Sequence, residues 1–328
     1  MDFDLPRDLP PLPDFGPVAV AAEYAAPRPA GATASPPLVQ PPHATPGSIE
    51  RRQLDGDPGL GYFIYVPSSG GVGARILASV HGISRNAREH AKMFAPLAER
   101  ADVVVVSPLF ERERFPAYQR LGRNERGERP DDVLDQIVAD ASRVSGACAD
   151  RVYLFGYSGG GQFVHRYVFA HPERVAAYAI GAAGWYTFPD PGRRFPYGIG
   201  RGRKAAVGEL VPRRFLDVPG CVLVGERDIH RGSALRNTAR VVLEQGHSRV
   251  ERGQRWAETM NREAQLLGLA PPIAFATLPR SPHSFRRSMR RGGMGERVFE
   301  YLFGELSAPA PATAALRTAP CAPPGVSC

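Results

Sequence analysis

The segment 152–163 reads Val-Tyr-Leu-Phe-Gly-Tyr-Ser-Gly-Gly-Gly-Gln-Phe. An apolar run stops at Gly156 and passes through a single serine, Ser158, directly into a helical pattern, which predicts a strand, a tight turn and a helix. The glycines two positions before and after the serine have a steric reason, because side chains there would collide where the strand and helix backbones approach each other. This arrangement is typical of a nucleophile elbow and makes Ser158 a candidate nucleophile.

The chain on either side of this segment alternates between apolar strands and amphipathic helices. Strands are predicted at residues 62–66, 75–80, 102–107, 175–180, 221–225 and 274–278. Helices are predicted at residues 87–99, with a kink or break at Pro96, and at 130–144, 159–170, 256–267 and 297–303. This alternation predicts an α/β fold with a mostly parallel sheet and helices on both faces. Residues 68–73 are interpreted as a hairpin loop, which gives the sheet an antiparallel N-terminal edge.

The two ends of the chain differ in composition from the segment between them. Residues 1–48 hold twelve prolines among Ala, Ser and Thr and have no periodic apolar face, so they are predicted to form a disordered arm. Residues 307–328 form a similar Ala/Pro-rich tail. Residues 49–306 are predicted to form one domain, with a lid-like insertion rich in Pro, Gly and Arg at about 186–215.

Composition excludes several classes of function. The chain has 328 residues, 43% of them hydrophobic, and a formal net charge of +8, carried by 39 Arg and only two Lys. Such an Arg skew beside much Ala, Gly and Pro is typical of a GC-rich genome, and because no nucleic-acid motif accompanies it, no nucleic-acid partner is expected. No apolar run in the sequence is long enough to cross a bilayer as a helix, so no membrane association is expected.

The start of the chain and its cysteines lead to expectations about location and cofactors. Residues 1–6 lack the basic start and apolar core of a secretory signal, so a cytoplasmic location is expected. Four cysteines, at positions 148, 221, 321 and 328, show no metal-ligand spacing. Neither a zinc site nor a disulfide framework is therefore expected, and no cofactor is needed by the chemistry that follows.

A serine hydroxyl needs a base within hydrogen-bond reach and an acid that orients that base. Asp228 follows Ser158 in the chain and His283 follows Asp228, each placed directly after an apolar strand. The order Ser, Asp, His and the placement at strand ends fit a catalytic triad on a parallel sheet. Glu226 is the alternative acid and His247 the alternative base.

A tetrahedral intermediate also needs two backbone donors aimed at its oxyanion. One is predicted to be the N–H of Gly159, directly after the nucleophile, and the other the N–H of Ile83, in the loop that follows the strand ending at Val80. The side chain of His81, in the same loop, is interpreted as an internal hydrogen-bonding group.

Four motifs together carry a family resemblance. Val80-His81-Gly82, the segment 156–160, Gly225-Glu226-Arg227-Asp228 and His283-Ser284-Phe285 stand in this order. In this order and spacing they resemble the α/β-hydrolase superfamily, and within it the chain is most similar to the esterase and polyhydroxybutyrate-depolymerase-like group, over roughly residues 62–303. The resemblance implies the α/β-hydrolase fold and a serine hydrolase.

The predicted activity is hydrolysis of a small-molecule carboxylic ester through an acyl-enzyme. Aromatic residues after two strand ends, among them Trp185, Tyr186 and Phe110, are predicted to line the substrate pocket. The same triad would also support a peptidase or an acyltransferase, and a catalytically silent hydrolase scaffold used for binding is a further alternative. The oligomeric state cannot be read from the sequence.

Overall fold

A computed structural model describes residues 43–201, 207–230 and 235–304. The predicted tail and residues 1–42 of the predicted arm lie outside the described residues. Residues 43–48 lead into the first strand, where the Ala44 N–H donates to the Val144 carbonyl at 3.0 Å and the Gly47 N–H to the Val66 carbonyl at 2.8 Å. These bonds hold the entry to the domain against the sheet and one of its helices.

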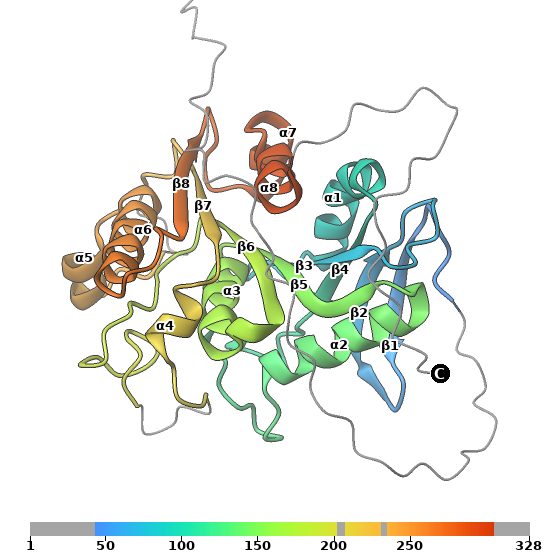
Figure 1. Ribbon diagram of the computed structural model, residues 1–328, viewed down its shortest axis with the longest axis horizontal. Coiled ribbons are helices and arrows are strands. Elements are labelled where there is room, and N and C mark those ends of the chain that lie inside the picture. The colour runs from blue at the N-terminus through green and yellow to red at the C-terminus, as the bar shows by residue number, and fades with distance from the viewer. Residues whose placement is uncertain (1–42, 202–206, 231–234, 305–328) are drawn as a thin grey trace, which may run out of the picture.

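One eight-stranded sheet forms the centre of the molecule (Figure 1). Its spatial order is β1 (Ile49–Leu54), β2 (Asp57–Tyr65), β4 (Val103–Leu109), β3 (Arg75–Val80), β5 (Cys148–Tyr157), β6 (Val175–Gly181), β7 (Gly220–Gly225) and β8 (Ile273–Leu278). All neighbours from β4 to β8 are parallel, whereas β1–β2 and β2–β4 are antiparallel. The predicted sheet, with its antiparallel N-terminal edge, is confirmed.

The predicted hairpin at residues 68–73 is wrong. This loop connects β2 to β3, but β2 pairs with β1 and β4, and β3 lies between β4 and β5. The hairpin is instead β1–β2, turning at Asp55 and Gly56. The physical reason is that β3 and β4 are joined through a helix, so β4 takes the place beside β3 that a hairpin would have given to β2. Loop composition indicates a turn, not which strand becomes the neighbour.

Helices cover both faces of the sheet. On one face lie α1 (Ala87–Ala101), α7 (Phe285–Arg291) and α8 (Met294–Phe303), and on the other α2 (Pro130–Ser145) and α3 (Gly159–Ala170) (Figure 1). At the β7–β8 end, α6 (Arg249–Leu266) packs against both strands. The described residues also form the short helices α4 (Pro212–Phe215) and α5 (Ala239–Gln245) and the 3₁₀ turns Tyr118–Arg120 and Pro172–Arg174.

The break predicted at Pro96 does not occur. Helix α1 runs through Pro96, which lies on the exposed side of the helix while Phe94 and Leu97 are buried. A proline in a helix removes one backbone donor, and here the buried face of α1 keeps the helix continuous. By contrast, α2 begins as predicted, with Pro130 in its first turn and Asp131 and Asp132 beside it.

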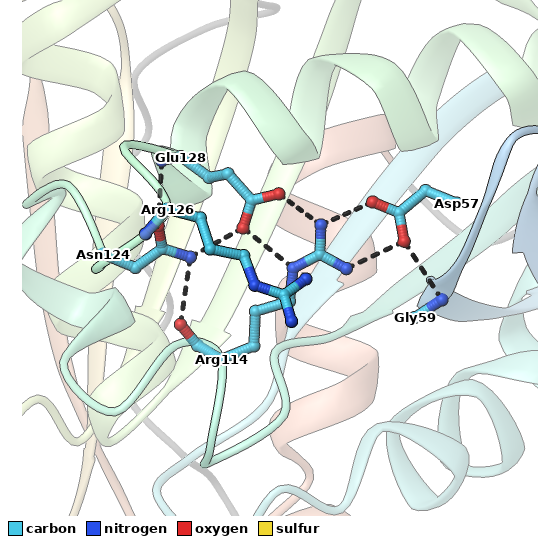
Figure 2. Close-up of polar contacts among 6 residues, drawn as sticks. All are labelled: Asp57, Gly59, Arg114, Asn124, Arg126 and Glu128. Carbon is cyan, nitrogen blue, oxygen red and sulfur yellow. Dashed lines mark hydrogen bonds and ion pairs between the residues drawn. The ribbon is translucent and has the colours of Figure 1, made fainter.

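The loop between β4 and α2 is fastened to the sheet by one arginine (Figure 2). The guanidinium of Arg114 donates to both carboxylate oxygens of Asp57, at 2.8 and 2.5 Å, and its Nε donates to Glu128 at 2.8 Å. Asn124 donates to the same Glu128 carboxylate at 2.7 Å. Hydrogen bonds from Arg114 lower the pKa of both carboxyl groups. The loop therefore has a fixed course over residues 110–129.

In the part of the chain that the structure describes, no helix is long and apolar enough to cross a membrane. The predicted insertion at 186–215 is described except for residues 202–206. Within it the Thr187 hydroxyl accepts from Arg166 at 2.9 Å and the Phe188 N–H donates to the Tyr197 carbonyl at 3.0 Å. A lid function for this segment stays a prediction.

Candidate active site

Ser158 occupies the sharp turn between β5 and α3. Its backbone has φ 54° and ψ −109°, a strained conformation for a residue with a side chain. A Cβ on Gly156 would lie 2.2 Å from the Gly160 carbonyl oxygen, and a Cβ on Gly160 would lie 2.0 Å from the Val80 carbonyl oxygen. The predicted steric need for glycine on both sides of the serine is confirmed, and the turn lifts the partly exposed Ser158 above the sheet.

The structure brings Ser158, His283 and Asp228 into one hydrogen-bonded chain. The Nε2 atom of His283 lies 3.1 Å from the Ser158 hydroxyl oxygen, and its Nδ1 lies 2.7 Å from an Asp228 carboxylate oxygen. The three residues follow β5, β8 and β7, which are close neighbours in the sheet. Asp228 is 2% exposed, whereas the His283 side chain is 25% exposed. The acid is therefore shielded from solvent, whereas the imidazole and the serine hydroxyl are accessible to a substrate.

The two alternatives considered from the sequence lie outside this chain. The carboxylate of Glu226 is exposed and accepts from the backbone N–H of Arg280. The backbone N–H of His247 donates to Glu251 at 2.9 Å, at the start of α6. Neither side chain takes part in the hydrogen bonds that join Ser158, His283 and Asp228, which favours Asp228 and His283 as the partners of the serine.

Packing holds the imidazole and its acid in place. The ring of Tyr157 stacks on His283 with centroids 5.4 Å apart. The Asp228 N–H donates to the Gly225 carbonyl at 2.9 Å, and the Arg227 N–H donates to the Ser281 carbonyl at 3.1 Å, so the loops after β7 and β8 are joined. A Cβ on Gly225 would lie 2.1 Å from the same Ser281 carbonyl oxygen. The two loops that carry the acid and the base therefore pack so closely that there is no room for a side chain at Gly225.

The two predicted oxyanion donors lie next to each other. A Cβ placed on Gly159 would be 3.4 Å from the backbone nitrogen of Ile83. Among the described residues, neither the Gly159 N–H nor the Ile83 N–H donates to an acceptor. Two free backbone donors beside the serine are the arrangement that stabilises an oxyanion.

His81 fixes the loop that carries Ile83. It is fully buried, its Nδ1 lies 2.8 Å from the Gly82 carbonyl oxygen, and its Nε2 accepts from the Phe110 N–H at 3.1 Å. Burial lowers the pKa of His81 to about 4, so the imidazole is neutral at pH 7. The Tyr118 hydroxyl donates to the His81 carbonyl at 2.6 Å. His81 is thus an internal hydrogen-bonding group, as predicted, and Tyr118 is a support that the sequence did not indicate.

Arg249 is a second residue of the site that sequence reasoning missed. It lies at the first position of α6, and its guanidinium donates to the Asp228 carboxylate oxygen that does not face His283, at 3.0 Å. Both side chains are almost completely buried, at 3% and 2% exposure. One carboxylate oxygen is thus held by Arg249 while the other receives the imidazole N–H.

The residues predicted to line the substrate pocket are packed inside the protein. Trp185 is 4% exposed and its ring lies close to two guanidinium groups, with Arg166 at 4.2 Å and Arg236 at 5.4 Å from the ring centroid. Tyr186 is fully buried and stacks on Trp256 with centroids 5.0 Å apart.

Phe110 is also fully buried, and its ring stacks on Tyr118 with centroids 5.1 Å apart. These contacts show a packing role for the three predicted pocket residues, and contact with a substrate stays a prediction. Across residues 43–201, 207–230 and 235–304, no cluster of three His, Cys, Asp or Glu side chains could hold a metal ion.

The sheet order, the strained serine turn and the positions of Asp228 and His283 after β7 and β8 define the α/β-hydrolase fold. No protein-family model matches the chain, and no curated protein matches it. Several solved structures are similar to it.

Poly(aspartic acid) hydrolase-1 from Sphingomonas sp. KT-1 is 25% identical, with a TM-score of 0.61, covering 71% of this chain and 93% of that one. The poly(3-hydroxybutyrate) depolymerase LpqC from Bordetella parapertussis is 24% identical, with a TM-score of 0.64, covering 80% and 91%. An S-formylglutathione hydrolase from Agrobacterium tumefaciens is 16% identical, with a TM-score of 0.51, covering 77% and 94%. The predicted fold, and the resemblance to the depolymerase-like group at the level of fold, are confirmed.

Proposed function

We propose that this protein is a serine hydrolase that cleaves carboxylic esters through an acyl-enzyme intermediate. The observation that carries the proposal is the hydrogen-bonded chain from Ser158 through His283 to Asp228, with two free backbone N–H groups beside the serine in the described part of the chain. A nucleophile, a base, an orienting acid and an oxyanion site are the four parts that acyl transfer needs.

In the proposed reaction the Ser158 oxygen attacks the ester carbonyl carbon while His283 Nε2 accepts the hydroxyl proton. The carbonyl oxygen becomes an oxyanion that accepts from the Gly159 and Ile83 N–H groups. The C–O bond to the alcohol then breaks, and His283 returns its proton to the leaving alkoxide. Water attacks the resulting ester of Ser158 in the same way, releasing the acid and restoring the serine. Asp228 holds Nδ1–H throughout, so that Nε2 is the nitrogen that takes part.

The ester preference has support from the names of two similar structures. The protein from Bordetella parapertussis is a depolymerase of poly(3-hydroxybutyrate), which is a polyester, and the Agrobacterium tumefaciens protein is a hydrolase of S-formylglutathione, which is a thioester. Both compounds offer an acyl carbon to a nucleophile. For this chain we infer a small carboxylic ester as the substrate. The cytoplasmic location of the protein stays a prediction, which fractionation of the producing cells would check.

The test is labelling with a fluorophosphonate followed by mapping of the modified residue. The label is expected on Ser158, and Ser158→Ala is expected to abolish labelling and to lower kcat for p-nitrophenyl esters by about 10⁶ where chemistry is limiting. His283→Ala should lose activity to a similar extent, whereas its matched control His247→Ala should keep it. A label on another residue, or near-normal turnover by Ser158→Ala, would exclude the mechanism. A parent protein that is neither labelled nor active would instead leave a catalytically silent scaffold as the interpretation.

Amide hydrolysis is a second candidate because one of the similar structures is a poly(aspartic acid) hydrolase, and poly(aspartic acid) is a polyamide. The same serine, histidine and oxyanion donors would serve either bond. Matched ester and amide substrates with one acyl group separate the two activities by the ratio of their kcat/KM values. Adding an alcohol acceptor to the ester assay detects acyl transfer as a new ester product.

A further inference from the structure

The surface beside the catalytic loops carries a cavity of about 580 Å³ that is lined by arginine alone. Its lining residues are Arg227, Arg280, Arg287, Arg290 and Arg291. They come from three separate segments: the loop after β7, the turn after β8, and helix α7. All five side chains are exposed, so their charged groups face solvent and a ligand can reach them.

These five positive charges are only partly compensated by carboxylates of the protein itself. Arg227 lies 3.9 Å from Glu226, and in the part of the chain that the structure describes no carboxylate forms an ion pair with the other four guanidinium groups. Glu89, on α1, forms its ion pair at 2.5 Å with Arg286, which is not part of the cavity, and also interacts electrostatically with Arg290. The cavity therefore has a strong excess of positive charge.

Helix α7 alone does not account for this arrangement. Arginines in the last turn of a helix interact favourably with its C-terminal dipole, which would explain Arg290 and Arg291. However, Arg287, Arg290 and Arg291 stand at i, i+3 and i+4, where like charges repel each other along one helix face. Arg227 and Arg280 add two further positive charges from loops, where no helix dipole stabilises them.

The backbone under the cavity is held by hydrogen bonds and close packing. The Glu226 N–H donates to the Leu278 carbonyl at 3.0 Å, which adds to the bond from the Arg227 N–H to Ser281. Arg280 has φ 51°, in the left-handed region that a residue with a side chain seldom adopts. A Cβ on Gly292 would lie 2.3 Å from the Ser281 hydroxyl oxygen, so the end of α7 is packed directly on the same turn. The backbone positions of the five arginines are thus set before a ligand binds, so that ordering on binding is confined to their side chains.

We infer that this arginine cavity is a binding site for a small multivalent oxyanion, one with several phosphate or carboxylate groups. Guanidinium groups match both oxyanions with paired hydrogen bonds, and a single multivalent ligand relieves repulsion among several arginines at once. The cavity volume is in the range of ordinary small-molecule sites. The inference does not depend on the proposed ester hydrolysis, because none of the five arginines takes part in that reaction.

The test is isothermal titration of the full chain with sodium tripolyphosphate and, separately, with citrate, in about 150 mM NaCl so that diffuse attraction is screened. Binding of either anion is expected with one site per chain, and the tighter of the two identifies phosphate or carboxylate as the source. The double variant Arg287→Ala/Arg291→Ala should weaken binding by about tenfold or more, since each lost arginine removes charge-assisted hydrogen bonds. The control Arg100→Ala/Arg126→Ala removes two exposed arginines elsewhere and should change the affinity by less than about twofold.

A second variant guards against misfolding. Arg280→Gly removes one cavity arginine at a position whose positive φ favours glycine, so it should fold at least as well as the parent while binding more weakly. No binding of either anion by the parent at millimolar concentration would overturn the inference. If the cavity variant and the control variant lost affinity for the anion equally, the attraction would be diffuse and the inference would be overturned. The same would follow if affinity depended only on the charge of the anion, so that acetate bound as tightly per unit charge as citrate.

Discussion

The contact between Arg249 and Asp228 leads to a prediction whose size follows from burial. Arg249→Met keeps most of the aliphatic stem of the side chain but removes the guanidinium that donates to Asp228 at 3.0 Å. The Asp228 carboxylate, which is 2% exposed, is then left with one oxygen without this donor. Removing one partner of a buried ion pair costs about 3–5 kcal/mol because the other charge stays desolvated. The free energy of unfolding should fall by that amount, which corresponds to a drop of roughly 10 °C in Tm for a domain of this size.

Activity should fall together with stability, since Asp228 is the group that orients His283. A displacement of the imidazole by about 1 Å would lower kcat/KM for an ester by up to about a hundredfold. Urea unfolding followed by fluorescence gives the stability, and steady-state hydrolysis of a p-nitrophenyl ester gives the rate. Arg262→Met, on the exposed side of the same helix with a side chain 66% exposed, is the matched control and should stay within about 0.5 kcal/mol of the parent.

A double-mutant cycle isolates the pair from other effects of the substitution. With Asp228→Asn as the second change, the combined loss of stability should be smaller than the sum of the single losses by about 1–3 kcal/mol. Strict additivity, or an Arg249→Met protein as stable as the parent, would refute the view that this arginine compensates the buried acid. Preserved stability with reduced kcat/KM would instead leave only an orienting role.

Two further predictions concern the serine turn and the buried histidines. Gly160→Ala should lower the free energy of unfolding by at least about 4 kcal/mol, because its Cβ would lie 2.0 Å from the Val80 carbonyl oxygen. The control Gly122→Ala, whose Cβ would have no atom within 4 Å, should be tolerated. Equal urea midpoints for the two variants would contradict the steric reasoning. Acid should also destabilise the protein. His81 is neutral when folded, with a pKa of about 4, and takes up a proton near pH 6.5 when unfolded, so the unfolded chain binds more protons between these values and stability falls as pH falls. The full loss for His81 alone is roughly 3 kcal/mol, and burial also lowers the pKa of His90 and His165, so urea midpoints that stay constant from pH 7 to pH 5 would contradict this assignment.

Much of the fold could be predicted because its signals are local. The apolar runs that became β4, β6 and β7 are buried along almost their whole length, so burial on both faces is visible in the sequence itself. The serine turn was equally clear, since its glycines answer a steric demand within a few residues. Asp228 and His283 could be singled out because each follows a strand, and parallel strands end at one edge of the sheet.

Other features depend on contacts between distant segments and left no local signal. The predicted pairing of β2 with β3 was wrong because the crossover from β3 to β4 decides which strands pair, not the loop that follows β2. Arg249 could not be distinguished from the many other arginines, since its role depends on α6 placing its first turn against the loop after β7. The packing of Tyr186 was hidden for the same reason, because its partner Trp256 lies on α6, in a distant part of the chain.

The separation in sequence of the three hydrogen-bonded residues has a consequence for how the protein comes to react. Ser158 and His283 are 125 residues apart, and Asp228 is 55 residues from His283. Their alignment requires β5, β6, β7 and β8 all to be paired, and each of these pairings joins segments that are distant in the sequence. A chain that has not completed this end of the sheet holds a serine without a base. Fluorophosphonate reactivity would therefore report the completion of this end of the sheet during folding, and the serine would stay unreactive until β8 had paired with β7.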